Sequence, residues 1–530
     1  MDGGIFDRLT RLLAGRLTRR SGLAAAALSL PAVAAARQPH GGARNGNSDS
    51  DSDSNGNSKG RGRGPQQEGP CGDGRRKGNI CTKDSQCCTG YCEVSLGKKN
   101  VDRKGRCRCI RRGKPCTPKQ TCCGKAACVD GVCGATAPPP PACQETGGTC
   151  ATDADCCSCL TCVSGACAAC VPLVCASGCD YTTVGDAYAA ASAGDTIYIG
   201  PGTYPTAITI DKDITLAACP CDTGVTLTVD RTVASPDSYY AILRDDAGDA
   251  SAYAVTLRNL TLEGTYPTDS YDILLQSTFQ EKTDWTLEDC TLKNAYYGLW
   301  APTGHVVITR GTVEKCFIGI NAQYEDGEEP SSLVMTDVTV SGCDSYGVLF
   351  DPWDDTAGTF STVTGCTFRD NPGYGLCLTG DFGVPPTVIT TVSNSTFTGN
   401  GGGTYQGLYL YGGLATVTGC TITGNTGGGV FLYDAETTII DTEIKSNGGE
   451  EGAGIDLLAH NRTVTTLTLD GTTMVSNNTA SANGGGISRS RQNGSVNYTV
   501  VGAGPRVTGN TPDQCYDANS YTVVDCATWV

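Results

Sequence analysis

The chain carries a degenerate repeat between Leu257 and Asn510, and this repeat constrains the fold more than any other feature. The clearest copy is Val417-Thr-Gly-Cys-Thr-Ile-Thr-Gly-Asn425, and further copies begin at Leu257, Leu287, Ile308, Met335, Val363, Val392, Ile439 and Leu469. Successive copies start 21 to 30 residues apart. A repeat of this length is typical of a solenoid, whose units bury their apolar faces only against neighbouring units.

Each copy alternates apolar residues with Thr or Ser, which predicts a β-strand. The inward positions are expected to hold Cys366, Phe368, Ser395, Phe397, Cys420 and Ile422. Each copy ends in an asparagine that suits a left-handed turn and can hydrogen-bond to its equivalent on the next coil: Asn371, Asn400, Asn425, Asn447, Asn477 and Asn510. A turn glycine and a second strand follow, as in Gly407-Leu-Tyr409, and a third apolar run leads back. We therefore predict three short strands per coil.

These coils resemble the right-handed parallel β-helix of the pectin lyase-like superfamily. The segment from Val184 to Tyr204, with its Gly-Asp-Thr strand and Pro-Gly-Thr-Tyr turn, is similar to the opening of many such proteins. The resemblance covers roughly residues 180 to 514 and implies an all-β solenoid. It says little about function, because the superfamily includes lyases, hydrolases, adhesins and surface proteins.

The first 70 residues have the composition of an export signal and a linker. Arg19-Arg20 precede an apolar run that ends in Ala34-Ala35-Ala36, so residues 1–36 are interpreted as an export signal peptide of the twin-arginine or Sec type. Residues 37–70 are rich in Gly, Ser, Asn and Asp and predict a disordered linker. The 32 cysteines of the chain indicate an oxidising compartment, and no other segment predicts a transmembrane span.

A cysteine framework follows from Cys71. The spacing C-x6-C-x5-CC-x4-C-x4-C occurs twice, over Cys109, Cys116, Cys122, Cys123, Cys128 and Cys133, and over Cys143, Cys150, Cys156, Cys157, Cys162 and Cys167. Residues 71–108 hold a looser version. Fifteen pairings are formally open, and zinc is the alternative to disulfides. The pattern resembles the inhibitor cystine knot, or knottin. That resemblance implies that the first cysteine of each set pairs with the fourth, the second with the fifth and the third with the sixth.

We therefore expect knottin-like modules at 71–108, 109–134 and 143–168, with a proline-rich spacer at 135–142. An amino-terminal cap at 169–222, stapled by Cys170, Cys175, Cys179, Cys219 and Cys221, precedes coils at 223–514. A cap at 515–530 is expected to be clipped by Cys515 and Cys526. Within the coils, Cys316 and Cys343 fall at the asparagine position of adjacent coils. Adjacent coils lie within disulfide range, so these two cysteines are a candidate disulfide. Cys290, Cys366 and Cys420 are too far apart to bond, which predicts buried free thiols.

Charge is divided unevenly along the chain. Residues 1–134 carry a net charge of +14, and residues 135–530 carry −30. The basic part suits contact with an anionic surface, although small disulfide modules are often basic without a function. The acidic part excludes nucleic acid as a partner and, without calcium, disfavours polyanionic sugars.

Side chains two and four residues after each turn glycine are expected to face solvent. They place aromatic rings on one flank, where sugar rings can pack, so the predicted ligand-binding residues are Trp300, Trp353, Tyr409, Tyr411, Phe431 and Tyr433. The alternative is that β-propensity alone puts these rings on strands. Acidic loops follow the strands. Asp351, Asp354 and Asp355 predict a Ca²⁺ site, and the candidate catalytic residues are Asp354, Asp355, Asp381 and Arg369. The alternative is that these acidic residues only form a solvated surface without a site.

The sequence thus favours a secreted or cell-surface protein that binds polysaccharide along the flank of a β-helix. One alternative is a polysaccharide lyase or glycoside hydrolase on the same flank. Another makes the knottin-like modules an inhibitor or toxin-like part with the β-helix as carrier. No cofactor beyond Ca²⁺ is expected.

Overall fold

The computed structural model describes residues 144–526 with short gaps at 152–154, 157–159, 164, 234–238, 246–251, 268–270, 278–282, 303, 324–330, 353–358, 381–387, 404, 461–463, 493–494, 502–505, 521 and 524–525. Before residue 144 it describes five short strands: β1 (Ile80–Cys81), β2 (Cys92–Glu93), β3 (Gly105–Cys107), β4 (Cys128–Val129) and β5 (Val132–Cys133). The chain forms two compact units, residues 1–137 and 138–530. The expected export signal, linker and proline-rich spacer lie outside the described residues.

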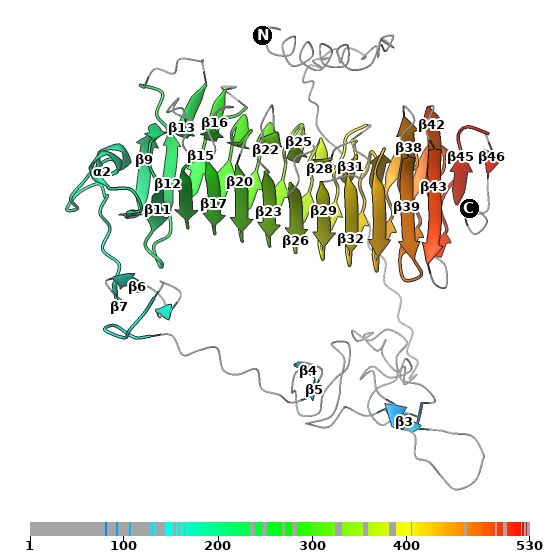
Figure 1. The fold of residues 1–530 in the computed structure, drawn as a ribbon, viewed down its shortest axis with the longest axis horizontal. Coiled ribbons are helices and arrows are strands. Elements are labelled where there is room, and N and C mark those ends of the chain that lie inside the picture. The colour runs from blue at the N-terminus through cyan, green and yellow to red at the C-terminus, as the bar shows by residue number, and fades with distance from the viewer. Residues whose placement is uncertain are drawn as a thin grey trace, which may run out of the picture. The chain divides into compact units, whose positions relative to one another are not determined.

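The second unit is built from three sheets of parallel strands that stack in chain order (Figure 1). The first sheet has 13 strands, of which only the last pair is antiparallel. Its strands are β10 (Ile208–Ile210), β13 (Tyr240–Asp245), β16 (Asp272–Ser277), β19 (Tyr297–Trp300), β22 (Ile318–Gln323), β25 (Tyr346–Asp351), β28 (Tyr374–Thr379), β31 (Leu408–Tyr411), β34 (Val430–Tyr433), β38 (Ile455–His460), β42 (Ile487–Gln492), β45 (Cys515–Asp517) and β46 (Thr522–Val523).

The second sheet holds the strands on which the sequence repeat begins. It consists of β8 (Thr196–Ile199), β11 (Ile214–Ala218), β14 (Ala254–Arg258), β17 (Asp284–Glu288), β20 (His305–Thr309), β23 (Ser332–Thr336), β26 (Phe360–Thr364), β29 (Ile389–Ser393), β32 (Leu414–Thr418), β35 (Glu436–Ile440), β39 (Val464–Asp470) and β43 (Ser495–Val501). The nine predicted repeat starts, from Leu257 to Leu469, pair with one another in one continuous column. The predicted register is therefore confirmed.

The third sheet follows the second after a turn of two residues in most coils. It consists of β9 (Gly202–Thr206), β12 (Val225–Val229), β15 (Thr261–Glu263), β18 (Thr291–Lys293), β21 (Thr312–Glu314), β24 (Thr339–Ser341), β27 (Thr367–Arg369), β30 (Thr396–Thr398), β33 (Thr421–Thr423), β36 (Glu443–Lys445), β40 (Met474–Ser476) and β44 (Arg506–Thr508). Two further strands, β37 (Gly448–Glu451) and β41 (Thr479–Asn483), pair beside the coils. The predicted parallel β-helix with three strands per coil is confirmed.

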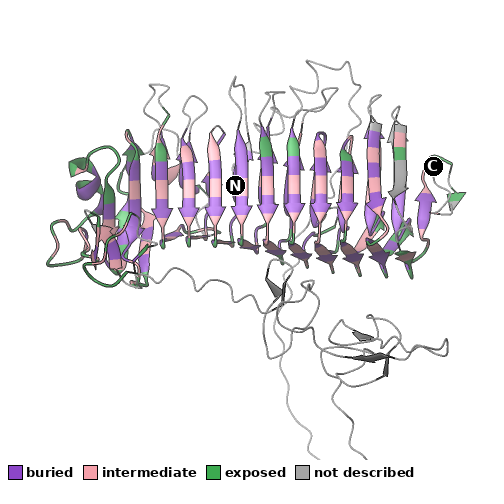
Figure 2. Ribbon diagram, turned by 60° about the horizontal axis from the view of Figure 1, so that its bottom comes forward, coloured by how far each residue is buried: buried purple, intermediate pink, exposed green. Residues whose placement is uncertain are grey.

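The interior follows from the alternation of side chains along each strand. Buried and partly exposed residues alternate as bands along the strands (Figure 2). The central residue of each third-sheet strand points inward, so Phe368 and Phe397 stack at 4.8 Å between ring centroids and 3° between planes. The predicted thiols Cys290, Cys366 and Cys420 are free and buried in the same core. The fold thus gains apolar burial with every added coil.

One prediction about the corner asparagines is confirmed and another is wrong. Their amides form a buried ladder, with Nδ2 of each residue donating to Oδ1 of the next, from Asn371 through Asn400, Asn425 and Asn447 to Asn478 and Asn510. Asn477 was predicted to belong to this ladder, but the ladder residue in this coil is Asn478. Asn477 is exposed and takes the left-handed turn, at φ +55°, so that the next residue points inward. The ladder residues themselves do not make that turn.

The amino-terminal end of the β-helix is closed by α2 (Val184–Ala190), which Thr183 caps by accepting a hydrogen bond from the Asp186 N–H. The Gly-Asp-Thr strand and the Pro-Gly-Thr-Tyr turn follow α2 in the expected order, as β8 and the start of β9. The cap is shorter than the 169–222 expected, because β8 to β10 already belong to the three sheets. Disulfides Cys170–Cys219 and Cys175–Cys179 hold this region, and Cys221 is also disulfide-bonded.

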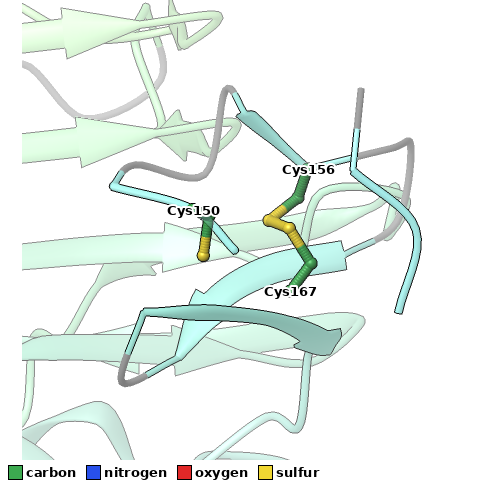
Figure 3. A group of neighbouring side chains, drawn as sticks. All are labelled: Cys150, Cys156 and Cys167. Atoms are coloured by element: carbon green, nitrogen blue, oxygen red, sulfur yellow. A yellow bond between two sulfur atoms is a disulfide. The ribbon is translucent and has the colours of Figure 1, made fainter. Parts of the chain in front are cut away.

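In the third cysteine module, β6 (Leu160–Val163) and β7 (Ala166–Ala169) form a hairpin. Cys150 bonds to Cys162, as the knottin resemblance implies. Cys156 bonds to Cys167, again as it implies (Figure 3). Cys150, Cys156 and Cys167 lie close together, but their sulfur atoms are in disulfides and leave no thiolate for zinc. Cys143 and Cys157 lie outside the described residues, as do the side chains of Cys109, Cys116, Cys122, Cys123, Cys128 and Cys133. Cys515 bonds to Cys526 as predicted.

The disulfide suggested for Cys316 and Cys343 is not present. Both thiols are free and fully buried, and they lie within hydrogen-bonding reach of each other. They occupy the positions that asparagine takes in later coils, because the Cys343 N–H donates to Oδ1 of Asn371. Among the described residues, no helix is long and apolar enough to cross a membrane.

Candidate functional site

The outer face of the first sheet carries the aromatic side chains that the sequence singled out. The register places Cys377, Tyr409 and Phe431 side by side on β28, β31 and β34. Two residues further along the same strands, Tyr411 pairs with Tyr433. Because parallel strands lie about 4.8 Å apart, equivalent side chains of successive coils come into contact.

These rings form a surface that we call the aromatic strip. It consists of Tyr239, Tyr271, Tyr296, Tyr297, Trp300, Phe317, Tyr346, Tyr374, Tyr405, Tyr409, Tyr411, Phe431 and Tyr433. Tyr346 stacks on Tyr374 at 5.1 Å, and Tyr409 stacks on Phe431 at 5.2 Å. In the register, Ile318 joins the Tyr297 and Tyr346 parts of the strip. The strip therefore runs over eight successive coils.

The strip is less open than the alternation of the strands predicted. Its rings cover one another, so most are half-buried, and Tyr405, at 41% exposed, is one of its most open members. Three outward residues between the rings, Asn321, Cys377 and Thr379, are buried. Burial raises the pKa of Tyr433 to about 12 and moves the pKa of Tyr346, Tyr374, Tyr409 and Tyr411 higher still. These five phenols are therefore neutral hydrogen-bonding groups at physiological pH.

Asp351 lies at the edge of the strip, where β25 ends. The hydroxyl of Thr379 on the next coil donates a hydrogen bond to its carboxylate. Asp354, Asp355 and Trp353, which were expected to join it, lie outside the described residues, as does Asp381. The predicted calcium site and these catalytic candidates therefore remain predictions.

Arg369 was proposed as a base beside the Asp351 group, and the structure contradicts this placement. Arg369 ends β27 in the third sheet, whereas Asp351 ends β25 in the first sheet. The guanidinium of Arg369 is instead paired with Asp370 at 3.1 Å, on the solvent side. The spacing of the repeat correctly places Arg369 and Asp351 on neighbouring coils. It does not reveal that they lie on different sheets.

Asp456 was not among the site residues predicted from the sequence. It follows Tyr409 and Phe431 in the same outward column of the first sheet. Gly452 folds over it so closely that a Cβ on this glycine would lie 2.4 Å from Cβ of Asp456. Burial, reinforced by the charge of Glu451, raises the pKa of Asp456 to about 7. The signal in the sequence was Gly452, whose positive φ of +54° permits this close approach.

Arg489, on the strand next to Asp456, faces away from it. Asp456 pairs in register with Ser488, and the adjacent residue Arg489 points to the other side of the sheet. There the guanidinium bonds to the carboxylate of Asp517 at 2.8 Å. The carboxyl of Asp456 thus has no arginine partner among the described residues, which is consistent with its raised pKa.

Comparison with known protein families agrees with this architecture. The model of the right-handed β-helix region matches residues 247–405 and 355–526, which together exceed half of the chain. The sequence matches no curated protein. Among solved structures, the mannuronan C-5 epimerase A-module of Azotobacter vinelandii is 15% identical, with a TM-score of 0.39, and the match covers 64% of this chain and 94% of that one.

Two other solved structures are similar at the same low level. A pectate lyase is 16% identical with a TM-score of 0.26, and the match covers 59% of this chain and 73% of that one. The tailspike protein 3 of bacteriophage CBA120 is 13% identical with a TM-score of 0.34, and the match covers 63% of this chain and 57% of that one. The family follows from the sequence model and the observed coils: this chain belongs to the right-handed β-helix family.

Proposed function

We propose that this protein binds a polysaccharide along the aromatic strip. The observation that carries the proposal is the pair of ring clusters on one face, joined through Ile318, that together cover eight successive coils. At about 4.8 Å per coil, the strip is about 34 Å long, which suits an extended chain better than a small molecule. Aromatic faces offer flat apolar surfaces, and the neutral phenols add hydrogen-bonding groups.

Charge favours an uncharged polysaccharide. Residues 135–530 carry a net charge of −30, which repels polyanions at low salt. The disulfides of the cap and of the third cysteine module support a location outside the cytosol. We therefore place the protein in the secreted or cell-surface class, with the knottin-like modules as a stalk or wall contact.

The test uses Tyr405, an exposed ring of the strip, and Tyr433, a half-buried ring near its carboxyl-terminal end. Tyr405→Ala combined with Tyr433→Ala is expected to abolish retardation of the full chain in gels that contain galactomannan, xyloglucan or dextran. Phe360→Ala is the matched control, because Phe360 is 39% exposed on the second sheet, away from the strip. Equal retardation of the double variant and the wild-type protein in every gel would contradict the proposal.

A second candidate function is cleavage of the bound chain as a lyase or hydrolase. Asp456 favours it, because a carboxyl with a pKa near 7 at the end of the strip can hold or release a proton at neutral pH. Cleavage predicts new reducing ends or unsaturated products from one of these polysaccharides or from polygalacturonate, with and without Ca²⁺, and their loss in Asp456→Asn. If the protein binds a polysaccharide but releases no product, cleavage is ruled out and binding is the remaining function.

A further inference from the structure

Two buried amides flank Trp300 on the outer face of the first sheet. Gln276 on β16 pairs in register with Trp300 on β19, and Trp300 pairs with Asn321 on β22. All three side chains point outward, because the residues on either side of each, such as Leu275 and Ile320, belong to the core. One indole ring therefore lies between two amides, each one coil away.

The oxygen of each amide lacks a hydrogen-bond partner in the described part of the protein around it. Gln276 is 3% exposed and Asn321 is 4% exposed, yet Oε1 of Gln276 and Oδ1 of Asn321 have no hydrogen-bond partner among the described residues. A buried acceptor without a partner costs about 1–3 kcal/mol. Such a group in a folded protein calls for an explanation.

Buried amides elsewhere in the same molecule show that the fold can satisfy them. In the ladder, Oδ1 of Asn400 accepts from Asn371, and Nδ2 of Asn400 donates to the carbonyl of Phe368 and to Oδ1 of Asn425. The Gln276 and Asn321 oxygens lack such partners, although they lie in the same kind of regular stack. A structural role therefore does not account for them.

We propose that Gln276, Trp300 and Asn321 form a subsite for one neutral sugar ring of the polysaccharide. This inference rests on the proposed function and specifies the ligand class at one position. The apolar face of the sugar packs on the indole ring, and hydroxyl groups at its two edges donate to the two amide oxygens. The terminal torsions of Gln and Asn are soft, so a small rotation turns each oxygen toward a ligand on Trp300.

The amides select a neutral sugar because they carry no charge to balance a carboxylate. Two cations lie near the subsite, and both are engaged in other interactions: Arg231 is paired with buried Asp272 at 2.7 Å, and Arg244, which pairs in register with Gln276, also has a partner of its own. Tyr297 stacks on Trp300 at 5.7 Å and Tyr239 meets it edge-on at 6.5 Å, so the indole is held in place before a ligand arrives. Such preorganisation lowers the entropic cost of binding.

The experiment replaces each amide by an apolar side chain of similar shape in the full chain. Gln276→Met and Asn321→Leu are each expected to weaken binding of the retained neutral polysaccharide about fivefold, the effect of one hydrogen bond. Their thermal midpoints should stay equal to the wild-type value or rise, because an unpartnered oxygen is removed. A purely structural role predicts the opposite, a lower midpoint.

Thr437→Val is the matched control. Its hydroxyl is also buried and unpartnered among the described residues, but Thr437 lies on β35 of the second sheet. The control should share the stability effect and leave binding unchanged. Galactomannan, xyloglucan and dextran are the neutral probes, and polygalacturonate is the charged one.

The outcomes separate this inference from the proposed function. If the wild-type protein binds, and the strip variant weakens binding while both amide variants do not, the subsite is refuted and the strip stands. If the amide variants weakened the binding of polygalacturonate but not of the neutral polysaccharides, the assignment of a neutral sugar to the subsite would be refuted. If the wild-type protein binds none of the four polysaccharides, the proposed function fails and the subsite fails with it.

Discussion

The side-chain amide of Asn425 donates a 2.9 Å hydrogen bond to Oδ1 of Asn447 on the next coil. The backbone N–H of Asn425 donates to the same oxygen at 3.0 Å, and Oδ1 of Asn425 receives the equivalent pair of bonds from Asn400. Each rung therefore satisfies the polar groups of its neighbour inside an apolar core. The ladder ends where Asn510 donates to Oε1 of Gln514, close to the carboxyl-terminal cap.

The adjacent residues Asn477 and Asn478 test which asparagine forms the rung. Asn478→Ala should lower the free energy of unfolding by about 3 kcal/mol, because it leaves buried donors and acceptors of two neighbouring rungs unpaired. Asn477→Gly should change it by less than about 0.5 kcal/mol, because glycine accepts the left-handed turn of this exposed residue. Denaturant unfolding of both variants is the measurement, and equal effects would contradict the assignment.

Aromatic packing inside the coils gives a second prediction. Phe397→Ala should destabilise the β-helix by about 3–5 kcal/mol, since the ring is fully buried and stacked on Phe368. Phe360→Ala is a matched control, because its ring is 39% exposed on the outside of the second sheet. Thermal unfolding should show a large loss for the first variant and a small one for the second. Similar losses would mean that the interior stack does not stabilise the coils.

The raised pKa of Asp456 predicts a pH dependence of stability. The carboxyl keeps its proton in the folded protein up to a pH of about 7, whereas in the unfolded chain it ionises near its ordinary pKa of 3.8. The folded state thus binds more protons in this window, so this group makes the protein less stable as the pH rises from about 4 to about 7.

The variant Asp456→Asn should remove that contribution. Its thermal midpoint, relative to the wild-type value, should rise progressively between about pH 4 and pH 7 and level off above. Asp470→Asn is the contrasting variant, because hydrogen bonds from Thr472 and Thr473 favour the ionised form and the pKa of Asp470 is lowered. A constant difference between Asp456→Asn and the wild-type protein at every pH would rule out the raised pKa.

The thiols of Cys316 and Cys343 give a prediction about oxidation. Hydrogen bonding to Cys343 and burial raise the pKa of Cys316 well above its usual value, and neither thiol is accessible. Both should resist a maleimide reagent in the native protein and react fully after denaturation without a reductant. Mass spectrometry of the labelled peptides is the measurement. Labelling that required a reductant would show that the two cysteines are bonded after all.

Much of the fold was predictable because the information that specifies it is local and repeated. The alternation in Thr421-Ile-Thr423 assigns one face of a strand, and the coil period then stacks Leu257, Val417 and Leu469 in one column. The same reasoning located Tyr409 and Phe431 on a common flank. It could not show how far each ring is covered, because the cover comes from rings on other coils.

The sequence by itself determined the solenoid, its register, the flank that carries the aromatic side chains and the buried free thiols of Cys290, Cys366 and Cys420. Only the tertiary structure decided that Asn478 rather than Asn477 points inward, that Arg369 and Asp351 lie on different sheets, and that Gly452 packs against Asp456. Periodicity fixes a side chain's place within a coil. The environment of that side chain depends on turns and on neighbouring coils, which the period does not encode.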